Sequence, residues 1–152
     1  MPLKRTDWTD RVFRHIRRLA GLQLYLSVLI GAELIGNVYY RALESVTDCK
    51  RLQHLCRIIV SDELAHVGFE SQLLLTLRAG SAAPLRILAR SAHRIFFAST
   101  AVVVWLTHRS VLRRAGHNAR SFLRSCRAQY VFYLEPHAID EGRRVADRIS
   151  DG

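Results

Sequence analysis

Apolar residues recur along most of the chain at the three- and four-residue spacing of an α-helix. Near the N-terminus one such stripe consists of Trp8, Val12, Phe13, Ile16 and Leu19. The 152 residues include only eight glycines and three prolines, so long stretches contain no helix breaker. The pattern predicts an all-α chain.

Breaker and capping residues divide this pattern into five predicted helices. The first begins near Thr6 or Asp7 and ends or bends at Gly21. Thr47 or Asp48 is expected to cap the third. The other four span about 22–44, 49–77, 84–114 and 119–133, with a further break near 91–94 in the 84–114 helix. Residues 1–134 form one helical domain, and residues 135–152 form a polar tail.

Two stretches are apolar enough to predict burial. The helix over 22–44 is apolar around most of its circumference, which is typical of a buried helix. The run Ile95–Leu106 is flanked by Arg94 and His108 and is shorter than the roughly 18 residues that a membrane span requires. A buried helix is therefore predicted here, with contact to a membrane surface as the alternative.

The chain carries a net charge of +10. No aromatic residues interleave with the arginines in a stacking pattern, so the charge favours solvated faces, acidic partners or lipid over a specific nucleic-acid site. Three cysteines at unpaired spacings predict neither a disulfide framework nor a zinc site, and they fit a cytoplasmic protein.

Glu33 lies in the middle of an apolar helix. A buried ionised carboxylate needs a cation, a metal or a hydrogen-bond partner, because desolvation without one is expensive. The alternative is a carboxylate that faces a hydrophilic seam or an arginine.

Glu63 and His66 are three residues apart, which places a carboxylate and an imidazole on one helix face. The alternative is an ordinary surface pair. Glu33 precedes Ser45 by 12 residues, and Glu63 follows Asp48 by 15. At 1.5 Å per residue these distances are roughly 18 and 22 Å from the turn. An antiparallel hairpin therefore brings Glu33 and Glu63 within about one helical turn of each other.

Further polar residues are positioned to support such a site. Helical spacing places Tyr40 and Asn37 on nearly the same side of their helix as Glu33. Asp62 points to a face next to that of Glu63, where it can orient a histidine from another helix. His54 lies on the opposite side of its helix from Glu63. The remaining histidines are predicted to be surface or cap residues: His15, His93, His108, His117 and His137.

The stretches AELIGNVYY at residues 32–40 and DELAHVGF at residues 62–69 resemble the second helix pair of ferritin-like di-iron carboxylate proteins. Rubrerythrins, bacterioferritins and the small subunit of ribonucleotide reductase share this arrangement. The resemblance implies a ferritin-like helical bundle with Glu33, Glu63 and His66 as metal ligands. It also implies that Asp62 holds a ligand histidine of the other half and that the metal is iron, with manganese as the alternative.

A complete single-chain member supplies four carboxylates and two histidines, whereas this chain supplies half of that set. Two explanations are open. A two-fold homodimer would complete the site, or the chain is the C-terminal part of a longer protein that lacks its N-terminal half here.

The sequence therefore predicts a metal-binding protein with oxidase, oxygenase or ferroxidase chemistry, and it selects no small-molecule substrate. The alternative is a non-catalytic, basic helical protein that binds a partner or a membrane surface. Nucleic-acid binding rests on charge alone.

Overall fold

The computed structural model describes the backbone of residues 8–135 and the side chains of residues 21–135. Within this range the chain forms four helices and no strand, which confirms the all-α prediction. The helices are α1 (Trp8–Val46), α2 (Lys50–Ala79), α3 (Ala83–Arg114) and α4 (Ala119–Leu134).

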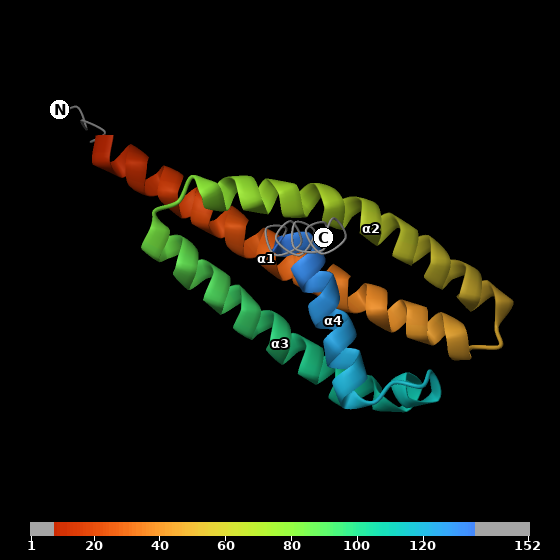
Figure 1. Cartoon of the computed structure of the whole chain (residues 1–152). Coiled ribbons are helices and arrows are strands. Elements are labelled where there is room, and N and C mark those ends of the chain that lie inside the picture. Colours follow the sequence, from red (N-terminus) through yellow and green to blue (C-terminus); the bar gives the residue numbers. More distant parts are fainter. Residues whose placement is uncertain (1–7, 136–152) are drawn as a thin grey trace, which may run out of the picture.

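The helix α1 is central, because it contacts each of the other three helices. Figure 1 shows α1 and α2 as an antiparallel hairpin, α3 along the other side of α1, and α4 returning obliquely across the bundle. At one end of the hairpin, Gln23 Nε2 donates to the Leu77 carbonyl at 3.2 Å. Towards the turn, Arg57 Nε lies 3.1 Å from Glu44 Oε1. These two contacts join α1 and α2 near the two ends of the hairpin.

Two predicted helix breaks are wrong. The helix α1 continues through Gly21, because one glycine costs a helix only about 1 kcal/mol and neighbouring turns compensate. No break occurs at residues 91–94 either. The helix α3 departs from helical geometry at His108 instead, with φ −114° and ψ 17°, and the His108 ring lies 4.7 Å from the Tyr39 ring. The predicted start at Thr6 or Asp7 lies outside the described residues.

The prediction that Thr47 or Asp48 caps α2 is wrong, because the N-cap residue is Cys49, which makes no side-chain cap bond. Thr47 stabilises the turn in another way: its carbonyl accepts from Gln53 Nε2 at 2.7 Å. The sequence analysis missed the capping box of α4. Ser121 N donates to Asn118 Oδ1 at 2.8 Å, and Asn118 N donates to Ser121 Oγ at 2.9 Å.

The hydrophobic core lies where α1 meets the other helices. Its fully buried members come from all four helices and include Ile30, Leu34, Leu74, Leu112 and Phe122. Aromatic pairs reinforce the α3–α4 contact, with ring centroids 4.8 Å apart for Phe97 and Tyr130.

The prediction that the run Ile95–Leu106 is buried is wrong for most of its residues. Ile95 is 67% exposed and Leu106 is 57% exposed, while Phe97, Ala101 and Trp105 face the core. By length and composition alone, the stretches Gly21–Val46 and Ala83–Arg114 are both able to cross a membrane. Only 22% of the apolar 18-residue segment within Ala83–Arg114 is buried. The apolar stretch in α3 is therefore longer than the twelve-residue run, within a helix whose bounds agree with the predicted 84–114.

One buried polar network joins all four helices. Arg78 of α2 donates through Nη2 to Ser27 Oγ of α1 at 3.1 Å and lies 3.0 Å from His93 Nδ1 of α3. The hydroxyl of Tyr130 on α4 is 3.4 Å from the same His93 nitrogen. All four side chains are buried, and no carboxylate pairs with Arg78 within the described part of the chain. We call this set the four-helix junction.

The prediction that His93 is a surface or cap residue is wrong, since it is 4% exposed. Burial, and to a smaller extent the nearby Arg78 guanidinium, lower the pKa of His93 to about 4. The imidazole is therefore neutral at pH 7, and it accepts from Arg78 through Nδ1.

The junction predicts acid sensitivity that depends on His93. Between pH 6.5 and 4 the unfolded chain binds a proton at this residue that the folded chain does not, so stability falls as the pH drops, by about 3 kcal/mol in total. His93→Gln removes this titration. Urea unfolding at pH 7 and pH 4.5 is expected to show a clearly smaller loss of stability for His93→Gln than for the unmodified chain. Equal losses would contradict the assignment.

Candidate functional site

Three carboxylates meet along one edge of the α1–α2 hairpin. Glu33 comes from α1, whereas Glu63 and Glu70 lie two turns apart on the same face of α2. Each is partly buried, and each leaves its Oε2 atom buried without a hydrogen-bond partner. We call these residues the carboxylate cluster.

Glu63 lies against α1 at Gly36. A Cβ at residue 36 would lie 3.5 Å from Glu63 Oε2 and 3.6 Å from Tyr40 Cε2. The Glu63 carboxylate therefore lies next to the α1 backbone and close to the Tyr40 ring. This placement agrees with the sequence prediction that Glu33, Tyr40 and Glu63 share one seam.

Ionisation of the cluster is disfavoured. The pKa of Glu33 is raised to about 7, first by burial and then by the charge of Glu70, by a hydrogen bond with Glu70 and by the charge of Glu63. Burial also raises the pKa of Glu63, and this rise is opposed by the nearby His66. Near neutral pH, Glu33 is therefore present in both its protonated and its ionised form, and a bound cation would displace the proton.

The other predicted site residues are arranged less closely. His66 and Asp62 are exposed on the outer side of α2. Asn37 is buried, and its Oδ1 accepts from Arg41 Nε at 2.8 Å. Among the residues that the structure describes, no three His, Cys, Asp or Glu side chains lie close enough to hold one metal ion. The hairpin thus brings together some of the residues that a metal site needs, but not a complete set of ligands.

Glu70 was not among the predicted ligands. Its signal in the sequence is the seven-residue spacing from Glu63, which places both side chains on one face of the helix. Buried neighbours on the same side, Val67 and Leu74, indicate that this face packs against another helix.

The hairpin face beside the cluster exposes several large apolar side chains. At helical spacing, Tyr25 shares a side of α1 with Gly36, and Phe69 shares a side of α2 with His66. Tyr25 is 63% exposed and Phe69 is 70% exposed; Leu22 and Leu55 are also exposed. We call this surface the open face.

No protein-family model, curated protein or solved structure compared with this chain matches it.

The raised pKa of Glu33 predicts a pH-dependent effect of Glu33→Gln on the metal-free protein. Between pH 4.5 and 7 the folded chain holds a proton on Glu33 that the unfolded chain releases, so the stability falls as the pH rises through this range and stays at the lower value above it. Glu33→Gln is expected to stabilise the protein by about 1 kcal/mol at pH 8, after allowance for solvent screening, and to have little effect at pH 4.5.

Glu44→Gln is the matched control, because Glu44 lies on the same helix and pairs with Arg57 at the surface. Glu44→Gln is expected to leave the free energy of unfolding at pH 8 unchanged or to lower it by less than about 1 kcal/mol. Chemical denaturation at the two pH values measures both variants. If the two substitutions changed the stability in the same way at both pH values, Glu33 would ionise in the folded chain without a loss of stability, which would contradict the prediction.

Proposed function

We propose that this chain is a ferritin-like metal-binding protein whose α1–α2 hairpin carries half of a di-iron carboxylate site. The ligands from one chain are Glu33, Glu63 and His66, and Glu70 is a further carboxylate at the same seam. The supporting observation is the carboxylate cluster, in which three oxygens from two helices are buried without partners. Such oxygens need a proton or a cation.

The donor set fits iron, with manganese as the alternative, because carboxylate oxygen and imidazole nitrogen suit both metals. The Glu63 carboxylate lies beside α1 at Gly36. His66 lies on the outer side of α2, towards the open face. A second chain packed on that face would therefore enclose His66 next to the carboxylates.

A second copy of the chain is the proposed source of the missing ligands. Packing two hairpins across a two-fold axis would pair Glu33, Glu63 and His66 with the same residues of the second copy. That set has four glutamates and two histidines, as in ferritin-like bundles. The exposed Tyr25 and Phe69 support this arrangement, because they lie where the second hairpin would pack.

When bound, a di-iron centre would supply oxygen or peroxide chemistry of the oxidase, oxygenase or ferroxidase type. The residues of this chain have separate roles. Glu33 would release its proton when a cation binds, and Tyr40 lies close to the Glu63 carboxylate.

Metal content and molecular mass, measured on the same freshly purified sample, test this proposal. Elemental analysis with light scattering is expected to give about two iron or manganese ions per dimer. Glu63→Ala is expected to lose the metal, while Glu44→Ala, outside the cluster, is expected to keep it. A folded monomer that binds no added iron or manganese would overturn the proposal.

A second candidate function is that of a non-catalytic protein on a membrane surface, and the exposed side of α3 favours it. The apolar side chains there include Ile87, Leu88, Ile95, Val103 and Leu106. Between Glu70 and Glu135 the chain has ten arginines and no acidic residue. Apolar area combined with basic charge suits an anionic lipid surface.

Flotation with lipid vesicles tests the second candidate. Binding to anionic vesicles is expected, with loss at high salt and much weaker binding to neutral vesicles. Leu106→Asp is expected to abolish it, because a charge on the exposed side of α3 opposes insertion. Phe69→Asp on the open face is the control and is expected to retain it. Equal loss in both variants, or no binding to anionic vesicles, would exclude a lipid-binding role for α3.

A further inference from the structure

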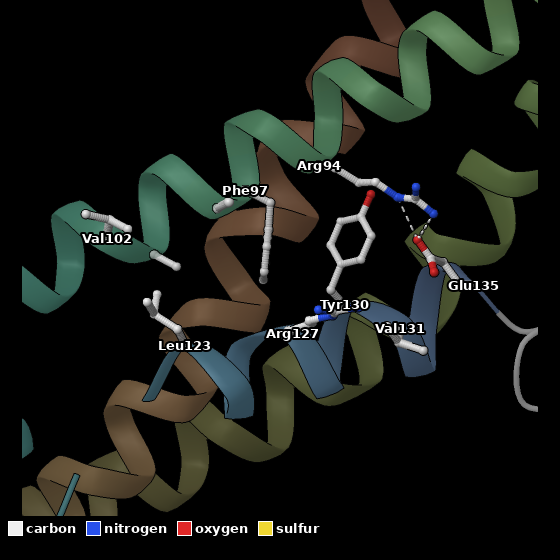
Figure 2. A pocket seen from close by; sticks show the side chains of 10 residues that line it. Arg94, Phe97, Val102, Leu123, Arg127, Tyr130, Val131 and Glu135 are labelled. Atoms are coloured by element: carbon white, nitrogen blue, oxygen red, sulfur yellow. Dashed lines mark hydrogen bonds and ion pairs between the residues drawn. The ribbon is translucent and has the colours of Figure 1, made fainter. Parts of the chain in front are cut away.

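A cavity of about 410 Å³ lies between α3 and α4, away from the carboxylate cluster (Figure 2). This volume falls within the range of small-molecule sites in proteins. The lining residues on α3 are Arg94, Phe97, Ala98, Ala101 and Val102; α4 and its C-cap contribute Leu123, Arg127, Tyr130, Val131 and Glu135.

Most of the cavity wall is apolar. Figure 2 shows Val102 and Leu123 at one end and Phe97 near the middle, beside the ring of Tyr130. Ala98 and Ala101 are small, so α3 leaves space opposite α4. A purely polar ligand such as inorganic phosphate would leave this wall in contact with water, whereas a hydrocarbon chain would cover it.

The other end of the cavity is polar and holds a carboxylate of the chain itself. Arg94 donates through Nε to Glu135 Oε1 at 2.9 Å, and its Nη2 donates to the same oxygen. The Tyr130 ring directs its hydroxyl towards Arg94 (Figure 2). Arg127 also lines the cavity and forms no ion pair within the described residues. The arrangement recognises a carboxylate next to an apolar wall.

The surroundings add positive charge, and among the described residues that line the cavity only Glu135 opposes it. Tyr130 contacts the four-helix junction, where Arg78 is 2% exposed, is hydrogen-bonded to neutral groups and leaves Nε without a partner. Apart from Glu135, the charged residues that line the cavity are arginines. An incoming anion would therefore be favoured over a neutral molecule of the same shape.

We propose that this cavity binds a fatty acid, with the carboxylate at Arg94 and Tyr130 and the hydrocarbon chain between α3 and α4. The fatty-acid carboxylate takes the place that Glu135 occupies in the free protein, so Glu135 acts as an internal competitor. The proposal does not depend on a metal at the carboxylate cluster.

Titration calorimetry with lauric acid, kept below the concentration at which it forms micelles, tests the proposal. Saturable binding of one molecule per chain is expected. Arg94→Leu is expected to weaken it by about tenfold or more, because two charge-assisted hydrogen bonds are lost. Glu135→Gln is expected to tighten it, because the competing carboxylate is removed. Arg120→Leu makes the same charge change on α4 outside the cavity and is expected to leave binding unchanged.

Two further measurements keep the test independent of folding defects. Ala98→Leu fills the cavity from an exposed position and is expected to reduce binding with the helical content preserved in circular dichroism. Dodecanol has the same chain length without the carboxylate and is expected to bind at least about tenfold more weakly than lauric acid. The proposal is overturned if dodecanol binds equally well, if Arg94→Leu and Arg120→Leu lose affinity equally, or if binding does not saturate.

Discussion

The packing of α1 against each of the other three helices is the contact on which the whole arrangement depends. Ile30 and Leu34 are fully buried in that packing, and Ser27 on the same helix enters the four-helix junction. Glu33 lies at the edge of the α2 contact rather than in the core. Helical periodicity therefore lets α1 hold the core together and present a carboxylate beside it. A loss of the α1–α2 contact would remove the core and the candidate site together.

The molecule keeps unbalanced charges of opposite sign in two separate places. The carboxylate cluster gathers negative charge at the hairpin edge, and the junction buries Arg78 with neutral partners only, within the described residues. Glu70 and Arg78 are eight residues apart on α2, which is roughly 12 Å along the axis, and they face different sides. They do not neutralise each other. The cluster therefore favours a cation, whereas the junction adds positive charge next to Tyr130, which lines the α3–α4 cavity where a carboxylate is proposed.

Apolar surface shows a similar division. The open face beside the cluster exposes Tyr25 and Phe69, and α3 exposes a longer apolar side on another part of the molecule. Large exposed apolar patches mark contacts with partners or lipid, because their burial is favourable. The open face adjoins incomplete metal ligands, which favours a second copy there. The side of α3 is accompanied by arginines, which favours an anionic lipid surface.

The periodicity and the breakers of the sequence determined the all-helical fold, most helix bounds, and the nearness of Glu33 to Glu63, because a short turn fixes the register of an antiparallel hairpin. Only the tertiary structure decided how each helix is rotated and which faces meet. It left His66 exposed beside Glu63, added Glu70 to the cluster, and buried His93 next to Arg78. It also formed the cavity between α3 and α4. These outcomes depend on contacts between residues far apart in the chain, and a local pattern of apolar positions does not specify such contacts.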